Sequence, residues 1–210
     1  MNSYITQMIA GGEGQKLDFK FEISDSKKIA RTLSAFANSD GGTILVGVKD
    51  NGSISGIRSD EEYYMLEAAA QLYCRPEVSF NVKQWQEDRK TILEVRIDKS
   101  KSPPHYALSD EGKWLAFIRV KDENILANRI MIRVWKRRGR HTGTLIRYSD
   151  KEKILFDYLR KHDTITLSMF QRIAQINKQT AENILVNLTV LNLIKITFRN
   201  KKIIYKLQNK

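Results

Sequence analysis

Apolar positions change from helical to strand spacing within one short stretch in the first quarter of the chain. Ile29, Leu33 and Phe36 recur at helical spacing, and residues 38–42, Asn-Ser-Asp-Gly-Gly, are of the types that end helices and turn the backbone. Residues 43–48 are almost continuously apolar and mostly β-branched, which is typical of a strand inside a sheet. The pattern predicts a helix, a tight turn and a buried strand.

Similar patterns predict the other elements of the first two thirds of the chain. Apolar residues alternate with Asp18, Lys20 and Glu22, so we expect a half-buried strand with one apolar and one charged face. Helical spacing returns at residues 122–135. The remaining expected elements are helices at 26–37, with Ser24 or Asp25 as the N-cap, and 61–73, and strands at 78–85, 91–97 and 114–120.

The pattern of the last third of the chain indicates three helices followed by a hairpin. The expected helices are 151–161, 167–175 and 178–193, and two strands then flank the cationic turn at residues 199–202. This order of elements predicts a winged helix-turn-helix.

A polar, glycine-containing run with many basic residues separates the two parts. It covers residues 137–148 and has no apolar period, so we interpret it as an interdomain linker. The expected fold class is therefore α+β, with a mixed sheet-and-helix domain at residues 1–136 and a winged helix at 149–210.

Length and composition indicate a globular protein with one large or two small domains: 210 residues, 41% of them hydrophobic. No window approaches the roughly eighteen apolar residues of a membrane span, and the N-terminus shows no export signal, so we expect a cytoplasmic protein. The single Cys74 indicates a buried thiol rather than a zinc site. His105, His141 and His162 lack metal-ligand spacing, and we expect them at the surface or in loops.

The net charge of +12 is unevenly distributed along the chain. Residues 1–128 hold 17 Lys and Arg against 19 Asp and Glu, whereas residues 129–210 hold 19 against 5. A near-neutral part joined to a strongly basic part predicts contact with a polyanion, and nucleic acid is the first candidate. An anionic membrane surface is the second, but the chain lacks a basic helix with a broad Trp/Phe/Leu face.

A winged helix would place its second motif helix in the DNA major groove, so exposed polar positions of residues 178–193 are candidates for reading bases. Cations at the hairpin tip, on the preceding helices and in the linker are candidates for phosphate contact. The alternative is a solvated basic face on a module that binds protein or forms dimers. The candidate residues are Lys178, Gln179, Thr180, Glu182, Asn183, Asn187, Arg160, Arg172, Arg199, Lys201, Lys202, Arg137, Arg138 and Arg140.

The first part carries a more specific signature. The run EGQKLDFK at residues 13–20 is followed by AFANSDGGTILVGVKDNG at 35–52, with weaker continuations in KSPPHY at 101–106 and FIRV at 117–120. These blocks resemble the AlbA-like domain of the Schlafen family, which is described in bacteria as a DNA-binding domain. The family pairing of this domain with a C-terminal winged helix implies a protein similar to bacterial transcription regulators.

The same resemblance also suggests an enzymatic activity. Some Schlafen relatives are endoribonucleases that cut structured RNA with three carboxylates, which implies Glu13 and Asp18, with Asp50 as the residue that could supply the third. Together they would hold Mg²⁺ or Mn²⁺. The chain departs from the pattern twice, because Asp18 stands where the family usually has Glu, and Lys49 directly follows the Gly-Val pair.

Strand geometry also bears on these carboxylates. Side chains alternate along a strand, so a shift of one residue points Asp50 to the other face if the strand continues. The odd separation of Glu13 and Asp18 places Glu13 in the turn before the strand. If these carboxylates do not form a metal site, Asp18 and Lys20 would be an exposed ion pair that contributes little to stability.

The sequence therefore favours a nucleic-acid-binding protein that prefers duplex DNA and regulates transcription, without a cofactor. The alternatives are a metal-dependent endoribonuclease acting on structured RNA, with Mg²⁺ or Mn²⁺, and a dimerising scaffold. Twofold-symmetric operators would fit a homodimer.

Overall fold

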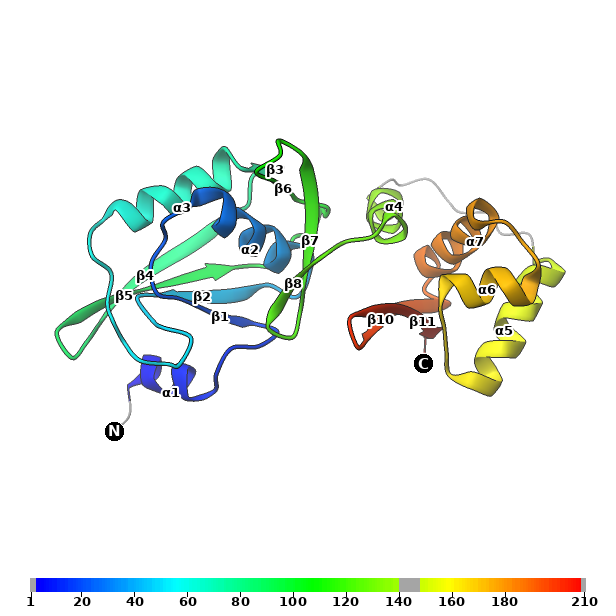
Figure 1. The fold of residues 1–210 in the computed structure, drawn as a ribbon, viewed down its shortest axis with the longest axis horizontal. Helices are drawn as coiled ribbons and strands as arrows, with labels where there is room; N and C mark the ends of the chain where they lie inside the picture. The colour runs from blue at the N-terminus through cyan, green and yellow to red at the C-terminus, as the bar shows by residue number, and fades with distance from the viewer. Residues whose placement is uncertain (1–2, 140–147, 209–210) are drawn as a thin grey trace. The chain divides into compact units, whose positions relative to one another are not determined.

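The computed structural model describes residues 3–139 and 148–208 (Figure 1). The chain divides into two compact units, Met1–Ala127 and Asn128–Lys210, and each unit has its own hydrophobic core. Within the described residues, each helix falls short of the length and apolar character that crossing a lipid bilayer requires.

The first unit combines helices with two four-stranded sheets, ordered β1-β2-β5-β4 and β3-β6-β7-β8. β1 and β2 pair in parallel, and the other pairs are antiparallel. The helices are α1 (Tyr4–Ala10), α2 (Ser26–Asn38) and α3 (Glu61–Gln71). The strands are β1 (Leu17–Lys20), β2 (Gly42–Val46), β3 (Cys74–Arg75), β4 (Phe80–Glu87), β5 (Lys90–Ile97), β6 (Tyr106–Leu108), β7 (Trp114–Val120) and β8 (Glu123–Leu126).

Helices cover both faces of the first sheet (Figure 1). α2 and α3 lie on one face, where Leu33, Phe36 and Leu66 pack with buried residues of β2 and β5. α1 lies on the other, where Ile5 packs against Phe19 and neighbouring apolar side chains. β2 is therefore an interior strand, as its continuous apolar run predicts, because both of its faces are buried.

The predicted turn between α2 and β2 depends on two glycines. Gly41 has φ +69, and a Cβ there would lie 2.7 Å from the Ile97 carbonyl oxygen. A Cβ on Gly42 would lie 2.5 Å from the Phe36 ring. A side chain at Gly42 would push α2 away from β2, and one at Gly41 would clash with the backbone at the end of β5. The glycines therefore permit close packing as well as the turn.

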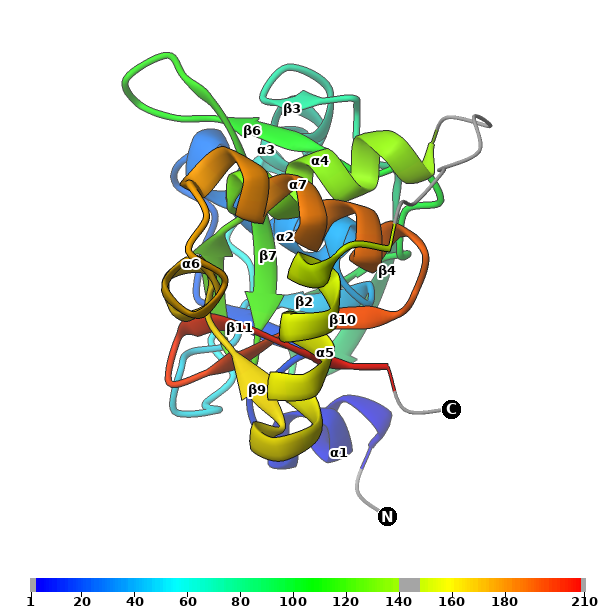
Figure 2. The ribbon, with the colours of Figure 1, turned by 90° about the vertical axis from the view of Figure 1, so that its right-hand side faces the viewer.

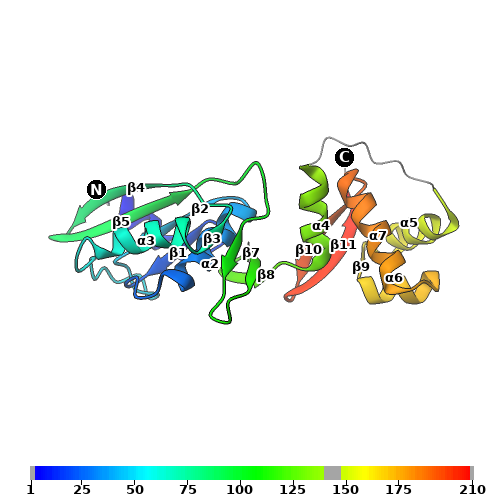
Figure 3. The ribbon, with the colours of Figure 1, turned by 90° about the horizontal axis from the view of Figure 1, so that it is seen from above.

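The second unit packs helices against a three-stranded sheet of order β10-β11-β9 (Figure 2). β10 and β11 form the predicted hairpin (Figure 3). Its helices are α4 (Arg129–Arg138), α5 (Asp150–His162), α6 (Leu167–Ala174) and α7 (Lys178–Val190), and its strands are β9 (Thr164–Ile165), β10 (Ile194–Arg199) and β11 (Lys202–Leu207).

One predicted helix is wrong in its first half. Residues 123–126 form β8, which pairs antiparallel with β7, and the helix begins only after Asn128. The Asn128 side chain accepts a hydrogen bond from the Met131 N–H and so caps α4. Because α4 packs in the second core through Ile130 and Val134, the units divide after Ala127 instead of at residue 136.

Expectations about two single residues can be compared with the structure. Cys74 is a buried thiol, as predicted, and burial raises its pKa to about 12. His105 lies in a loop but is buried, and its ring nitrogens contact the Pro76 carbonyl at 2.9 Å and the Ser100 hydroxyl at 2.7 Å. The expected surface or loop position is therefore met by the loop, which folds inward and buries the histidine.

Candidate nucleic-acid interface

Asp18 lies on β1 and is buried, contrary to the expected exposed pair with Lys20. One carboxylate oxygen lies 2.8 Å from a guanidinium nitrogen of Arg119 on β7, and the other lies 2.5 Å from the Lys20 ammonium. Arg119 is itself buried and also donates to the Leu17 and Gly14 carbonyls. Asp18 is therefore the counter-ion of an internal arginine that joins two sheets.

Glu13 precedes β1, in the turn where the odd spacing places it. Its carboxylate accepts the Phe19 N–H at 2.8 Å. Burial raises its pKa above the ordinary 4.5, the neighbouring Asp18 raises it further, and the hydrogen bond from Phe19 acts in the opposite direction. The structure thus brings Glu13 and Asp18 together.

Asp50 does not join them. It is exposed in a turn that follows Val48, because β2 has already ended and only an isolated bridge from Val48 to Ile54 continues the pairing. Within residues 3–139 and 148–208, no group of three or more His, Cys, Asp or Glu side chains is arranged to hold a metal ion. The three carboxylates expected to lie together are therefore corrected to two adjacent ones, Glu13 and Asp18. Because Asp18 already forms ion pairs with Arg119 and Lys20, these residues do not fit a divalent metal.

A second buried network was missed by sequence reasoning. Asn38, at the end of α2, donates hydrogen bonds to the carbonyls of His105 and Phe117 at 2.8 and 2.9 Å. The Ser34 hydroxyl also donates to the His105 carbonyl. The available signal was a polar residue within the apolar run of α2, but its partners lie more than 60 positions away. The network joins α2 to the backbone at residues 105 and 117, where the sequence blocks of the motif meet.

In the second unit, α4 lies alongside α7 (Figure 2). Arg133 donates to the Asn183 side-chain oxygen at 2.6 Å, and Arg137 donates to that of Asn187. Arg138 donates to the Thr189 carbonyl at 2.8 Å and to the Asn192 side chain. Arginines of α4 therefore follow one side of α7 from Asn183 to its C-terminal end.

This contact corrects two expectations. Glu182, predicted to be exposed, is 3% exposed and forms ion pairs with Arg129 and Arg133 at 3.8 and 3.7 Å. Arg137 and Arg138, predicted to lie in the linker, form the last turn of α4. Sequence reasoning found the polar positions of α7 but not their partner, because it assigned α4 to the first domain.

The first turn of α7 remains accessible. Lys178 and Gln179 are exposed and Thr180 is half-buried, while the Asn177 side chain caps the helix by accepting the Thr180 N–H at 2.8 Å. A helix N-terminus presents unpaired N–H groups and a partial positive charge. This end of α7 is thus suited to an anionic ligand.

The tip of the β10–β11 hairpin is the second accessible cationic region. Arg199 and Lys202 pair at the ends of the strands, and Asn200 and Lys201 between them have positive φ values of 49 and 62. That geometry is a two-residue turn that keeps the strands tightly paired. Arg199, Lys201 and Lys202 are all exposed.

The other predicted contacts lie elsewhere. Arg172 on α6 is exposed and contacts the Met169 sulfur, and Arg160 on α5 forms an ion pair with Asp157 at 2.9 Å. Arg140 lies outside the described residues.

Acidic residues do little to offset this charge at the surface. Of the five Asp and Glu in residues 129–210, Glu182 is buried beside α4, and Glu152 is buried in the capping box of α5 with Ser149. Three of the five acidic side chains are therefore left at the described surface of the second unit, where basic residues far outnumber them.

Comparisons with known proteins connect this chain to a family. The family model described as "Schlafen, AlbA_2" matches residues 13–144. A comparison with curated proteins found no match. Two matching solved structures, each 19% identical, are the DIP2311 protein from Corynebacterium diphtheriae, with a TM-score of 0.48, and the N-terminal domain of a RecG-related protein from Nitrosomonas europaea, with 0.42. The matches cover 64% and 68% of this chain, and 29% and 100% of those structures, respectively.

Proposed function

The chain belongs to the Schlafen AlbA_2 family, and on that premise we propose that it binds nucleic acid, with a winged helix in its second unit that contacts duplex DNA. The observation that carries the proposal is the 19 to 5 excess of basic over acidic residues in that unit, two of whose acids are buried. Recognition of particular duplex sequences would make the protein a transcription regulator.

Two accessible regions form the proposed contact surface. In helix-turn-helix proteins, residues near the N-terminus of the recognition helix reach base edges, a role that Lys178, Gln179 and Thr180 of α7 can take. The hairpin tip would contact phosphate through Arg199 and Lys202. Asn183 and Asn187 are assigned to the α4 contact instead of to base reading, because arginines already occupy their side-chain oxygens.

The test is fluorescence anisotropy of the full chain with labelled duplex DNA over a range of salt concentrations. The triple variant Arg199→Ala/Lys201→Ala/Lys202→Ala is expected to weaken binding and to reduce the salt slope by about one unit for each phosphate that it no longer neutralises. The control Lys28→Ala/Arg89→Ala/Lys101→Ala removes three exposed cations from the first unit and should leave both unchanged. Equal duplex affinity and salt slope in the two variants would contradict the proposal.

Base reading has a separate test. Genomic fragments retained by the protein are sequenced, and the same selection is repeated with Lys178→Ala/Gln179→Ala. The expected result is a changed sequence preference, because base contacts specify and phosphate contacts position. Sedimentation of the bound complex would show whether a homodimer occupies the site.

The structure does not favour the endoribonuclease as a second function. The Asp18 carboxylate is neutralised by Arg119 and Lys20, and Asp50 lies outside the pair formed by Glu13 and Asp18. We therefore derive no metal-dependent step from these residues.

A further inference from the structure

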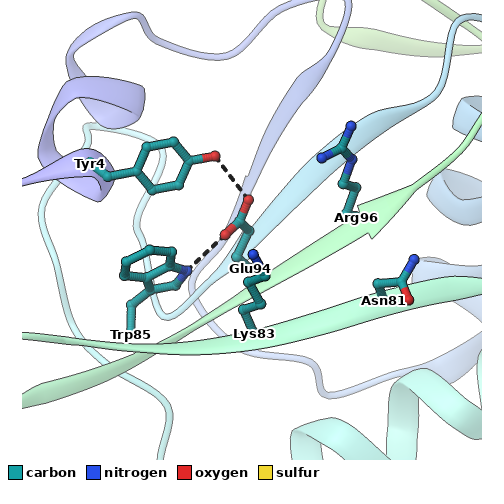
Figure 4. A pocket seen from close by; sticks show the side chains of 6 residues that line it. All are labelled: Tyr4, Asn81, Lys83, Trp85, Glu94 and Arg96. Atoms are coloured by element: carbon teal, nitrogen blue, oxygen red, sulfur yellow. Dashed lines mark hydrogen bonds between the residues drawn. The ribbon is translucent and has the colours of Figure 1, made fainter.

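The first unit contains a pocket of about 270 Å³ on the outer face of the β4–β5 hairpin, beside α1 (Figure 4). Successive strand side chains point to opposite faces, so alternate residues of β4 and β5 share this face. The lining residues are Tyr4, Asn81, Lys83, Trp85, Glu94 and Arg96. Apart from Tyr4 on α1, the lining residues lie on the paired strands β4 and β5.

The pocket lies where the apolar cover of the sheet gives way to polar side chains. α1 is seven residues long, and its apolar side chains pack on Ile92 and Trp85 at one end of the hairpin. Further along the same face, Lys83 opposes Glu94 and Asn81 opposes Arg96 in the strand register. The polar half of the face is thus adjacent to two aromatic rings.

Glu94 is the central residue of the pocket. It is 7% exposed, and its two carboxylate oxygens accept the Tyr4 hydroxyl at 3.0 Å and the Trp85 indole N–H at 2.7 Å (Figure 4). In the part of the chain that the structure describes, Glu94 has no ion-pair partner. Each oxygen retains a second lone pair, so the carboxylate can accept two further hydrogen bonds.

The two donors to Glu94 are also its aromatic neighbours. The rings of Tyr4 and Trp85 have centroids 5.1 Å apart at 37°, and the Tyr4 side chain is 50% exposed. Because both rings are held by the same carboxylate, a planar ligand that enters the pocket meets a fixed aromatic surface. Stacking on such a surface does not depend on ligand charge.

Cations surround this aromatic surface. Lys83 and Arg96 line the pocket, and a second cavity of about 310 Å³ shares Tyr4, Glu94 and Arg96 with it and adds Lys16 and Lys99. Lys99 pairs with Asp40 at 3.4 Å and Arg96 with Asp98 at 4.0 Å. Lys16 and Lys83 have no ion-pair partner within residues 3–139 and 148–208.

We propose that the two adjoining cavities bind one guanine nucleotide. The base stacks against Tyr4 and offers its adjacent N–H groups to Glu94, and the phosphate lies among Arg96, Lys83 and Lys16. Guanine fits the carboxylate because N1–H and the N2 amino group donate side by side, whereas the corresponding edge of adenine carries an acceptor beside its donor.

An inorganic anion alone would not explain the pocket. An anion would use the cations but would leave the aromatic surface and the open lone pairs of Glu94 without a role. A nucleotide uses all three groups, and it can be free or part of an unpaired strand, since both offer the same base and phosphate. The proposal goes beyond the duplex contact of the second unit and involves none of its residues.

The test is calorimetric titration of the full chain with GMP, AMP, inorganic phosphate and a short single strand that contains one guanine. The indole N–H signal of Trp85, assigned by Trp85→Phe, reports occupancy of the pocket by NMR. We expect GMP to bind about 10-fold more tightly than AMP. Tighter binding of the strand than of GMP would assign the site to single-stranded nucleic acid, and the reverse to a free nucleotide, and either result supports the pocket.

Variants identify the contributing groups. Glu94→Gln should weaken GMP about 10-fold more than AMP, because an amide replaces one acceptor with a donor. Lys83→Ala, at an exposed position where folding is not at risk, should weaken both nucleotides, and Tyr4→Ala should do the same by removing the stacking surface. Lys28→Ala, an exposed cation elsewhere in the unit, is the matched control and should change neither.

Three results would overturn the proposal: no heat and no Trp85 shift with either nucleotide, equal affinity for GMP and AMP, or affinities that Lys83→Ala leaves unchanged. Loss of duplex binding in the hairpin variant bears on the second unit alone, so the two proposals can fail independently.

Discussion

Asn38 and His105 are joined by a reciprocal pair of hydrogen bonds: the Asn38 side-chain oxygen accepts the His105 N–H at 2.7 Å, and its amide nitrogen donates to the His105 carbonyl at 2.8 Å. The side chain thereby satisfies a buried peptide unit in the way that a neighbouring strand would. The asparagine of the AFAN block therefore holds the loop that carries His105 against α2.

Asn38→Ala is expected to lower the free energy of unfolding of the first unit by about 3 kcal/mol. The substitution removes the partner of the buried His105 N–H and the side-chain donor to the Phe117 carbonyl, whereas the His105 carbonyl keeps the Ser34 hydroxyl. A buried polar group left without a partner costs more than its hydrogen bond contributes. Urea unfolding of the full chain, followed by the fluorescence of the tryptophans, measures the change. Asn81→Ala, at an exposed position on β4, should stay within about 0.5 kcal/mol.

Arg119→Ala should destabilise the first unit by about 3–5 kcal/mol, because Asp18 would keep its buried charge without its main partner. Asp18→Leu/Arg119→Met should lose clearly less than the sum of the two single variants, since removing both charges removes the uncompensated one. The measurement is a double-mutant cycle from urea unfolding. Additive losses would show that the pair does not act as a unit.

The raised pKa of Glu13 predicts a pH dependence with a definite sign. The folded state favours the protonated acid, so the contribution of Glu13 to stability is largest below pH 4.5 and falls as the pH rises through the raised pKa. Glu13→Gln keeps an oxygen for the Phe19 N–H and does not titrate. The variant should therefore gain stability relative to the parent between about pH 4 and about pH 7, as urea midpoints at the two values would show. A constant difference would contradict the assignment.

Arg133→Ala/Arg137→Ala should lower the stability of the second unit by roughly 1–3 kcal/mol, because both guanidinium groups donate to side chains of α7. If these arginines serve the helix contact alone, the salt slope of duplex binding stays as in the parent protein. A slope reduced by about two units would instead place them on phosphate. Anisotropy titrations at several salt concentrations, paired with thermal unfolding, separate the two roles.

Local patterns predicted most of the elements. The helix-turn-strand at residues 26–46, the β4–β5 hairpin and the cationic β10–β11 hairpin follow from spacing, glycines and turn chemistry, all of which act over a few residues. The N-cap of α2 is Asp25, one of the two predicted candidates, and it could be predicted because a cap bonds to its own helix.

The errors concern contacts between distant segments. The local pattern around Asp18 predicts an exposed strand residue until Arg119, more than 100 positions later, is placed beside it. Residues 123–126 continue a helical period, and only their pairing with β7 makes them a strand. The pattern around Glu182 predicts an exposed side chain because the helix that covers it is far away in sequence. That helix, α4, follows β8 of the first unit but packs in the core of the second unit. No local pattern carries information of this kind.

α4 lies within residues 13–144, which the family model matches, but its Ile130 and Val134 pack in the core of the second unit. A genetic exchange that replaced everything after residue 144 would leave this amphipathic segment without its apolar partner. An exchange that keeps both cores intact would instead fall near Ala127, because the first compact unit ends there, whereas the family match continues to residue 144.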